Sequence, residues 1–178
     1  MKIDAPPSSG HAAVLLRQLE RRDIEAWYGY LRLPEVFQHT SWNLQSSDDL
    51  LPMFDEFEAT SADSIRRLAI VDRGSHQLIG TIGFHSISNM NRTAEIAFDL
   101  SPFYWGKGIA STVCDAVTEW SFSAYGFVRV QATVLQTNSR SMEVLRRCRF
   151  QYEGLMRSFR MVRGTPGDFS LFARLSHD

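Results

Sequence analysis

Two glycines, Gly106 and Gly108, stand between an alternating apolar run, Ala94 to Leu100, and a helical pattern that begins near Ile109. Glycine permits a tight turn with no Cβ in the way, and the first N–H groups of the following helix have no partner inside that helix. A phosphate or pyrophosphate would satisfy those donors and meet the positive end of the helix dipole, with Lys107 as a further cation. The stretch is therefore a candidate anion site, although an ordinary strand-to-helix turn would also explain the spacing.

Two common phosphate-binding motifs can be tested against this stretch. The pattern G-x-x-x-x-G-K-[ST] fails because Gly108 follows Lys107. The pattern G-x-G-x-x-G matches only in its first two glycines, because Ser111 holds the third position and no acidic residue lies about 20 residues further on. The sequence therefore supports neither a P-loop nor a dinucleotide-binding fingerprint.

The strand that leads into the glycines carries two carboxylates, Glu95 and Asp99. A period of two places both on the face opposite to the apolar set of Ala94, Ile96, Phe98 and Leu100. Further along the chain, Asn138 and Ser141 share a face at the start of a predicted helix, where either side chain could cap the helix.

The run Tyr104 to Ala110, Y-W-G-K-G-I-A, resembles the pyrophosphate-binding loop Q/R-x-x-G-x-G/A of the GNAT superfamily of N-acetyltransferases, which holds acetyl-CoA. Gly106 and Gly108 fill the two small-residue positions, whereas Phe103 stands where the pattern has Gln or Arg. Y-W-G-K-G is similar to the RimJ/RimL-like branch, which acetylates ribosomal-protein N-termini. Other segments match in family order over nearly the whole chain: L-L-R-Q-L-E-R-R-D (Leu15 to Asp23), A-E-I-A-F-D-L (Ala94 to Leu100) and N-S-R-S-M-E-V-L-R-R-C-R-F-Q-Y-E-G (Asn138 to Gly154).

This resemblance implies acetyl-CoA as co-substrate, held by the loop and by backbone groups of the preceding strand that pair with the pantetheine arm. To admit that arm, the strand must diverge from the next one in the sheet. The Asn of the N-x-x-S motif bonds the coenzyme arm in the resembling family. The coenzyme-binding residues expected on this basis are Phe98, Asp99, Leu100, Trp105, Gly106, Lys107, Gly108, Ile109, Ala110, Asn138 and Ser141.

Acetyl transfer to an amine requires that the amine lose a proton, so Glu95 is the candidate general base, acting directly or through water. Glu95 could instead be a solvated or salt-bridged strand residue. Asp99 is left out of catalysis because a carboxylate beside pyrophosphate would be repelled. In the resembling family the Ser of N-x-x-S lies near the thioester sulfur, which makes Ser141 the second catalytic candidate, as donor to the leaving thiolate.

The expected acceptor is a protein N-terminal α-amine. An α-amine has a pKa of about 8 and a lysine side chain one of about 10.4, so a single carboxylate suits the α-amine better. Two alternatives remain open: a small-molecule acceptor such as a polyamine, an aminoglycoside or an amino-acid-like metabolite, and a non-catalytic acyl-CoA-binding module. An acidic acceptor cleft would favour cationic acceptors, and the residues available for it are Asp48, Asp49, Asp55, Glu56 and Glu58.

The composition is that of one ordinary globular domain: 178 residues, 44% hydrophobic and 22% charged, with a formal charge of −1. This charge provides no basic surface for nucleic acid, and no apolar run is long enough to span a membrane. Cys114 and Cys148 are read as reduced thiols, which favours a cytoplasmic location. We expect a flexible tail at 1–10, a GNAT domain at 11–178, no metal site, and a monomer or homodimer.

Apolar periodicity predicts the element order β-α-α-β-β-β-α-β-α-β-β, an α/β fold with a mixed, mostly antiparallel sheet of about seven strands and helices on both faces. The expected ranges are strands at 13–19, 67–71, 78–84, 93–100, 127–135, 152–162 and 168–175, and helices at 22–33, from about 47 to before 66, 109–125 and 138–148. Residues 86–92 are expected to form a turn.

Two local features are singled out for the structure to decide. The segment from Glu35 to Ser47 carries Phe37, His39 and Trp42, which could line a substrate cleft or pin the loop to the core. Arg149 stands where the family has glycine at a helix end, which implies strain or a different cap.

Overall fold

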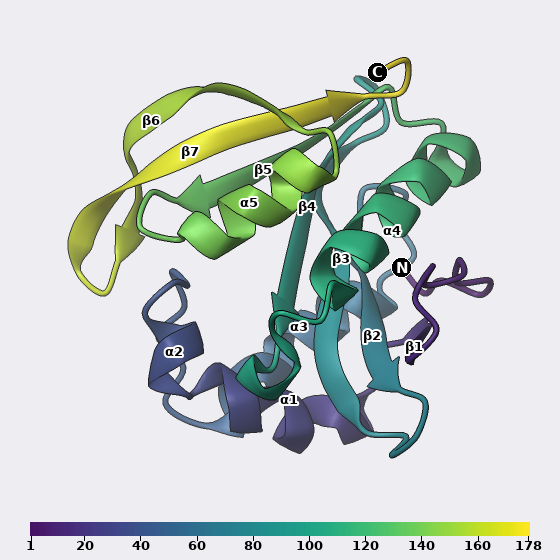
Figure 1. The fold of residues 1–178 in the computed structure, drawn as a ribbon, viewed down its shortest axis with the longest axis vertical. Helices are drawn as coiled ribbons and strands as arrows, with labels where there is room; N and C mark the ends of the chain where they lie inside the picture. Colours follow the sequence, from purple (N-terminus) through teal and green to yellow (C-terminus); the bar gives the residue numbers. More distant parts are fainter.

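The computed structural model describes all residues, 1–178, as a seven-stranded sheet in the order β1-β2-β3-β4-β5-β7-β6 (Figure 1). The strands are β1 (Val14–Gln18), β2 (Arg66–Asp72), β3 (Leu78–Ser88), β4 (Thr93–Leu100), β5 (Arg129–Leu135), β6 (Gln151–Val162) and β7 (Thr165–Leu175). The helices are α1 (Ile24–Leu31), α2 (Pro34–Phe37), α3 (Leu51–Glu58), α4 (Ile109–Tyr125) and α5 (Ser139–Arg147), with 3₁₀ turns η1 (Arg21–Asp23), η2 (Ser47–Leu50) and η3 (Pro102–Tyr104). The predicted α/β class, mixed sheet and element order are confirmed.

The central break in the sheet lies between β4 and β5, which form its single parallel pair. Their pairing extends only from Thr93 with Arg129 to Glu95 with Gln131. Beyond Glu95, the rest of β4 has no partner on β5, and the two strands diverge in Figure 1. The divergence that the family resemblance implied is therefore present.

Helices cover both faces of the sheet, as predicted. The apolar face of β4 and β5 packs against α4 and α5 in one core, which includes Ile96, Val113 and Leu145. The opposite face packs against α1 and α3 in a second core around Trp27 and Phe54. Because side chains of a strand alternate between faces, Glu95 and Asp99 lie on the side of this second core. None of the helices combines the length and apolarity that crossing a membrane requires.

The first ten residues lie against the domain, in contrast to the flexible tail expected there. The Met1 ammonium donates a hydrogen bond to the Ile65 carbonyl at 2.8 Å, and the side chain of Ile3 is buried in the core. The Ser9 hydroxyl, also buried, donates to the Val14 carbonyl at 2.7 Å. These contacts were missed because the residues are few and scattered, without any periodicity.

Strand β3 is longer than the sequence predicted, because Ser86 and its neighbours belong to the strand instead of a turn. The pairing of β3 with β4 shifts register between His85 and Ser88, and Ser86 has a positive φ of 48°. This combination is a β-bulge, which bends a strand and redirects its side chains. The turn itself is confined to residues 89–92.

Candidate active site

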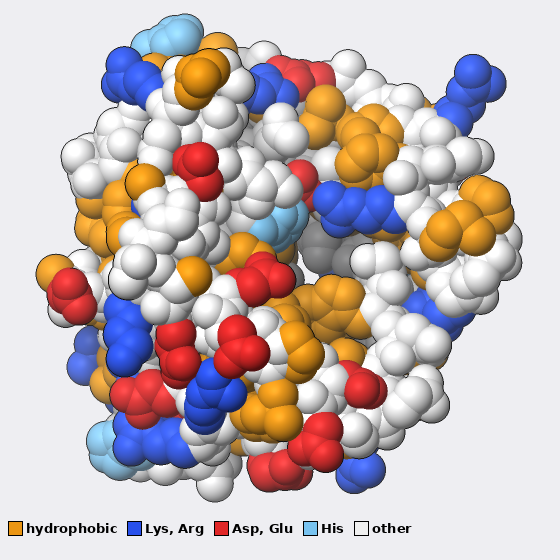
Figure 2. Space-filling model, turned by 180° about the vertical axis from the view of Figure 1, so that it is seen from behind, with side chains coloured by type: hydrophobic (Ala, Val, Ile, Leu, Met, Phe, Trp, Pro, Cys, Tyr) orange, Lys and Arg blue, Asp and Glu red, His pale blue; other side chains and the backbone are white.

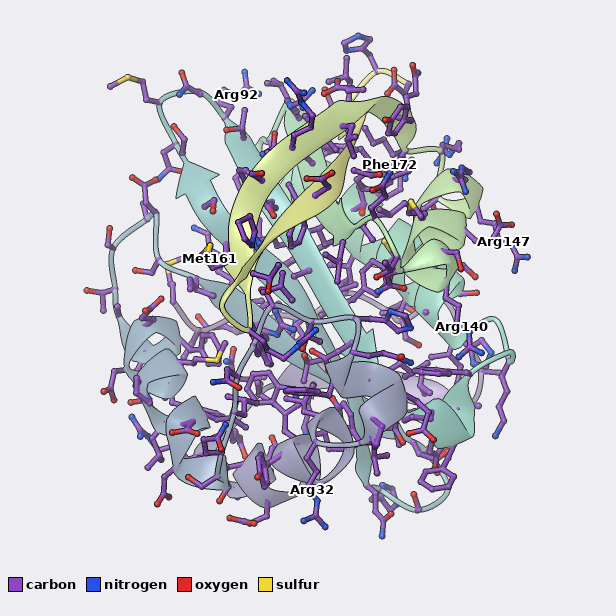
Figure 3. The ribbon with its side chains drawn as sticks, turned by 90° about the vertical axis from the view of Figure 1, so that its left-hand side faces the viewer. Arg32, Arg92, Arg140, Arg147, Met161 and Phe172 are labelled. Carbon is purple, nitrogen blue, oxygen red and sulfur yellow. The ribbon has the colours of Figure 1, made fainter.

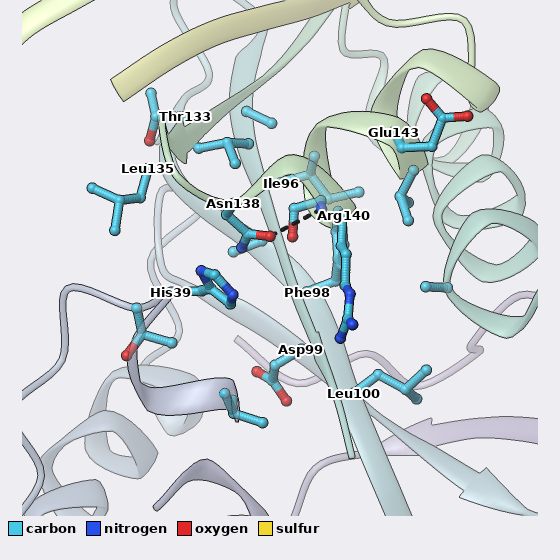
Figure 4. Close-up of a pocket in the computed structure, with 18 of the residues that line it drawn as sticks. His39, Ile96, Phe98, Asp99, Leu100, Thr133, Leu135, Asn138, Arg140 and Glu143 are labelled. Carbon is cyan, nitrogen blue, oxygen red and sulfur yellow. Dashed lines mark hydrogen bonds between the residues drawn. The ribbon is translucent and has the colours of Figure 1, made fainter. Parts of the chain in front are cut away.

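A cavity of about 950 Å³ opens where β4 and β5 diverge. It is lined by the free end of β4, the glycine turn, the start of α5, and the segment that follows α2. Figure 2 shows a hollow near the middle of the molecular surface, and Figure 4 shows how side chains from these elements face one another. The cavity brings together the glycine turn, β4 and the Asn138 helix, as the sequence suggested.

The glycine turn has the geometry of an anion cradle. Gly106 and Gly108 have φ of 74° and 76°, and a Cβ added at either position would meet no atom within 4 Å. No side chain caps the N-terminus of α4, so its first N–H groups face the turn unpaired. The residues therefore fit a phosphate group, which backbone donors and the helix dipole would stabilise.

The residues that flank this turn lie in different places: in the core, along the cavity or at the surface. Ile109 is buried in the core, and Ala110 borders the cavity. Trp105 lines the cavity, and its indole Nε1 donates a hydrogen bond to the Leu100 carbonyl at 2.8 Å. The Lys107 ammonium lies over the Tyr104 ring, 4.8 Å from its centroid, and its side chain is exposed outside the cavity. The Lys107 ammonium, which was expected to be a further cation for the phosphate, thus lies outside the cavity.

Arg140 is a cavity residue that the sequence analysis missed. Its guanidinium stacks on the Trp105 indole at 4.5 Å and makes no hydrogen bond or ion pair with the protein. In Figure 4 the side chain extends from α5 toward β4 near Leu100. The only available signal was its place inside the N-S-R-S motif, which does not indicate on which side of the helix start it points.

Glu95 is the last residue of β4 that pairs with β5, so it lies where these two strands begin to diverge. Its side chain is buried. Its Oε1 accepts hydrogen bonds from the Thr133 hydroxyl and, at 3.1 Å, from the Arg160 guanidinium. The imidazole Nε2 of His85 lies 3.8 Å from the same oxygen. The carboxylate is therefore salt-bridged, as one of the two readings had it, and it also lines the cavity, where its role as a base stays a prediction.

Asp99 occupies a separate polar cluster on the same face of β4. Its carboxylate accepts hydrogen bonds from the Arg67 guanidinium at 2.6 Å, from the Thr81 hydroxyl at 2.7 Å, and from the Tyr30 hydroxyl. Burial and the Asp99 charge raise the pKa of Tyr30 well above its usual value, so Tyr30 stays a donor. The Asp99 charge is compensated within the protein, and its backbone is paired with Thr81 of β3.

At the start of α5, the side chains of Asn138 and Ser141 make different contacts. Asn138 Oδ1 accepts a hydrogen bond from the backbone N–H of Ser141 at 3.1 Å, which caps the helix (Figure 4). The Ser141 hydroxyl makes no hydrogen bond with the protein, and the residue lines the cavity. The hydroxyl is therefore free to interact with a ligand.

The hairpin of β6 and β7 closes the far side of the cavity against α2. Arg163, at the hairpin turn, donates hydrogen bonds to the carbonyls of Phe37 at 3.2 Å, Gln38 at 3.3 Å and Thr40 at 2.9 Å. In Figure 3 this hairpin, marked by Met161 and Phe172, reaches toward the layer of α1 to α3. The contact makes the end of α2 a fixed wall of the cavity.

The aromatic segment after α2 has both of the roles that the sequence left open. Trp42 packs edge-on against the buried Trp27, with ring centroids 5.8 Å apart, and so pins the segment to the core. His39 and Trp42 also line the cavity. The pKa of His39 is lowered by burial and by the nearby Arg140 charge, which favours the neutral imidazole.

Comparison with known proteins agrees with this geometry. The family model described as acetyltransferase (GNAT) domain matches residues 13–151. The uncharacterized N-acetyltransferase YoaA of Bacillus subtilis (strain 168) is 33% identical over 162 residues, which cover 90% of this chain and 92% of that protein.

Two solved structures illustrate the similarity of the fold. Spermidine N-acetyltransferase from Vibrio cholerae in complex with CoA and spermine superposes with a TM-score of 0.81 at 22% identity, covering 94% of this chain and 98% of that one. RimL, a ribosomal L7/L12 α-N-protein acetyltransferase in complex with coenzyme A, gives a TM-score of 0.81 at 19% identity, covering 95% and 98%. At these identities the likeness concerns the fold alone.

Proposed function

The chain belongs to the GNAT family and is an acetyl-CoA-dependent N-acetyltransferase, and from this premise we propose that its acceptor is a protein N-terminal α-amine. The observation that carries this proposal is the charge of the cavity. Two of its carboxylates are compensated by arginines, Glu95 by Arg160 and Asp99 by Arg67. A cavity of this kind suits an acceptor with one positive charge.

A polyamine needs several uncompensated carboxylates, and the cavity offers few. Glu143 pairs with Arg147 at 3.0 Å, so Glu35, which is exposed, is the one cavity carboxylate without a basic partner. The five acidic residues that the sequence offered for a cationic acceptor do not line the cavity: Asp48, Asp49, Asp55, Glu56 and Glu58. These features disfavour the polyamine alternative.

For the coenzyme, we propose the turn at Gly106 and Gly108 with the α4 N-terminus as the pyrophosphate site. The open edge of β4 at Phe98 to Leu100, with Asn138 opposite, would hold the pantetheine arm. Acetyl-CoA supplies the activated acetyl group when it is bound there. The Arg140 guanidinium, which makes no hydrogen bond or ion pair with the protein, lines this cavity and could add a charge-assisted hydrogen bond.

For the reaction, we propose that the cluster around Glu95 serves deprotonation of the amine and that Ser141 serves the leaving thiolate. Glu95 lies where the strands separate and lines the cavity from β4. Ser141, whose hydroxyl makes no hydrogen bond with the protein, lines the same cavity from the start of α5. An acid and a base that line one cavity can act on the two ends of one transfer.

The test is acetyl-CoA turnover, followed by thiol release, with N-terminal peptides, spermidine, spermine and aminoglycosides as acceptors. We expect the highest kcat/KM with a peptide α-amine, and no activity when that amine is blocked by formylation. Higher kcat/KM with spermidine than with every peptide would overturn the proposed acceptor. Acetyl-CoA binding without turnover of any amine would overturn the enzymatic function altogether.

A further inference from the structure

His85 is a titratable cavity residue to which none of the roles above has been assigned. It pairs with Glu95 across β3 and β4, so both side chains lie on the same face of the sheet at the point where β4 and β5 separate. Its side chain is 25% exposed, and the exposed part lines the cavity. His85 is thus accessible to an acceptor amine at the place where the proposed transfer occurs.

The backbone around His85 is distorted in a way that orients this imidazole. The β-bulge immediately after His85 places Ser86 at a positive φ of 48°, a conformation that side-chain-bearing residues seldom adopt. The Ser86 hydroxyl then lies 3.1 Å from His85 Nδ1. Bulges are common beside active sites, where they redirect a side chain. In the tautomer whose Nδ1 proton is donated to Ser86 Oγ, Nε2 is the nitrogen that can accept a proton.

The charges that face His85 come from three strands. Burial lowers the pKa of His85 below 6.5; Glu95 on β4 acts in the opposite direction, and Arg67 on β2 and Arg160 on β6 lower it further. The imidazole is therefore mostly neutral at neutral pH and can accept a proton. Glu95 would then stabilise the imidazolium that forms.

Glu95 itself is less suited to receive the proton. Its Oε1 already accepts hydrogen bonds from Arg160 and Thr133, which leaves only Oε2 for a proton, and 6% of its side chain is exposed. His85 Nε2, by contrast, makes no hydrogen bond with the protein and lies 3.8 Å from Glu95 Oε1. Unlike the carboxylate of a catalytic triad, which holds the nitrogen that is not the base, Glu95 faces Nε2 itself and so acts on the imidazole through its charge.

We propose that His85 Nε2 takes the proton from the acceptor ammonium and that Glu95 acts as the positioning residue for the imidazole. This inference rests on the proposed function. The N–H bond to one ammonium proton breaks as the Nε2–H bond forms, and the nitrogen lone pair then forms the amide bond while the C–S bond of the thioester breaks. The second nitrogen proton ends on the departing thiolate, and the imidazolium returns its proton to water.

The experiment compares pH profiles of kcat with a peptide acceptor for the parent, His85→Asn, His85→Gln and Glu95→Gln. For the parent we expect kcat to rise with pH to a plateau, with the midpoint of the rise below pH 6.5, following the lowered pKa of His85. Either His85 variant should lose about 10²-fold in kcat near pH 7 and show no plateau, because only solvent then removes the proton. Glu95→Gln should keep the plateau, shifted to lower pH, at reduced kcat.

Direct titration of the imidazole provides a second readout. Nuclear magnetic resonance of the His85 ring protons should show its pKa falling in Glu95→Gln and rising in Arg160→Gln, in line with the charges that face it. His76→Asn serves as the matched control, because His76 is exposed in the β2–β3 turn, where its positive φ of 58° suits asparagine. The control should keep both kcat and the profile.

The outcomes separate this inference from the proposed function. A parent that turns over amines, together with His85 variants that retain the parental plateau, would overturn the role of His85 alone. Loss of the plateau in Glu95→Gln, with both His85 variants unaffected, would assign the proton to Glu95. A parent that binds acetyl-CoA but acetylates no amine would overturn the proposed function and this inference with it.

Discussion

Asn138 Oδ1 accepts a hydrogen bond from the backbone N–H of Ser141 at 3.1 Å. Asn138 therefore caps α5, whereas the free hydroxyl in the cavity belongs to Ser141. Capping and proton donation, which the sequence could not assign separately, are therefore open to separate tests.

We predict that Ser141→Ala lowers turnover at least tenfold and changes the melting temperature by less than about 1 °C, because its hydroxyl bonds nothing in the protein. Asn138→Ala removes the cap, which typically contributes about 1 kcal/mol, and should lower the melting temperature by roughly 2–4 °C. Thermal unfolding and thiol release measure both effects. A Ser141→Ala protein with full turnover would show that the hydroxyl has no part in the reaction.

Substitution of Gly108 should weaken acetyl-CoA binding without filling any space that the protein itself uses. A Cβ at Gly108 meets no protein atom within 4 Å, but the positive φ of 76° strains any other residue there and would disturb the turn that forms the anion cradle. We expect the Gly108→Ala variant to bind acetyl-CoA at least tenfold more weakly than the parent, as measured by calorimetry.

The control for this prediction is Gly164→Ala, in the β6–β7 turn. Gly164 also has a positive φ, 84°, and open space around its Cβ position, so it carries the same backbone strain away from the cradle. Equal loss of affinity in the two variants would indicate general destabilisation and not a binding site.

Arg163→Ala should loosen the wall that the hairpin and α2 form together. The variant loses three hydrogen bonds to the carbonyls at the end of α2, and a cation stacked 4.6 Å from the Phe37 ring centroid. We expect faster amide exchange in residues 37–42 and a several-fold higher KM for the acceptor, with unchanged affinity for acetyl-CoA. Arg157→Ala, an exposed change on the same hairpin, is the control. Unaltered exchange in Arg163→Ala would mean that α2 is held by other contacts.

Arg149→Gly should stabilise the protein modestly. Arg149 follows α5 with a positive φ of 64°, the left-handed conformation that glycine adopts without strain. Its two ion pairs, with Glu119 at 2.6 Å and Asp115 at 3.5 Å, are about half exposed and therefore weak. We expect the melting temperature to rise by roughly 1–3 °C, since relief of strain outweighs the lost pairs. A lower melting temperature would show that the ion pairs dominate.

The sequence by itself determined the features that depend on local spacing. Gly106 and Gly108 indicated the turn because only glycine adopts a positive φ cheaply before a helix. The alternation in β4 placed Glu95 and Asp99 on one face, and the predicted range of that strand, 93–100, coincides with the one in the structure. Arg149 signalled an unusual helix end, which its φ of 64° confirms. Each of these conclusions needed information from only a few neighbouring residues.

The tertiary structure decided what depends on pairing between distant segments. Glu95 meets Arg160 across 65 positions, and Arg163 meets Phe37 across 126. His85 faces Glu95 because of the β3–β4 register and the adjacent bulge, neither of which local composition specifies. A strand pattern assigns a side chain to a face, but its neighbours on that face follow from register, twist and the point at which two strands separate.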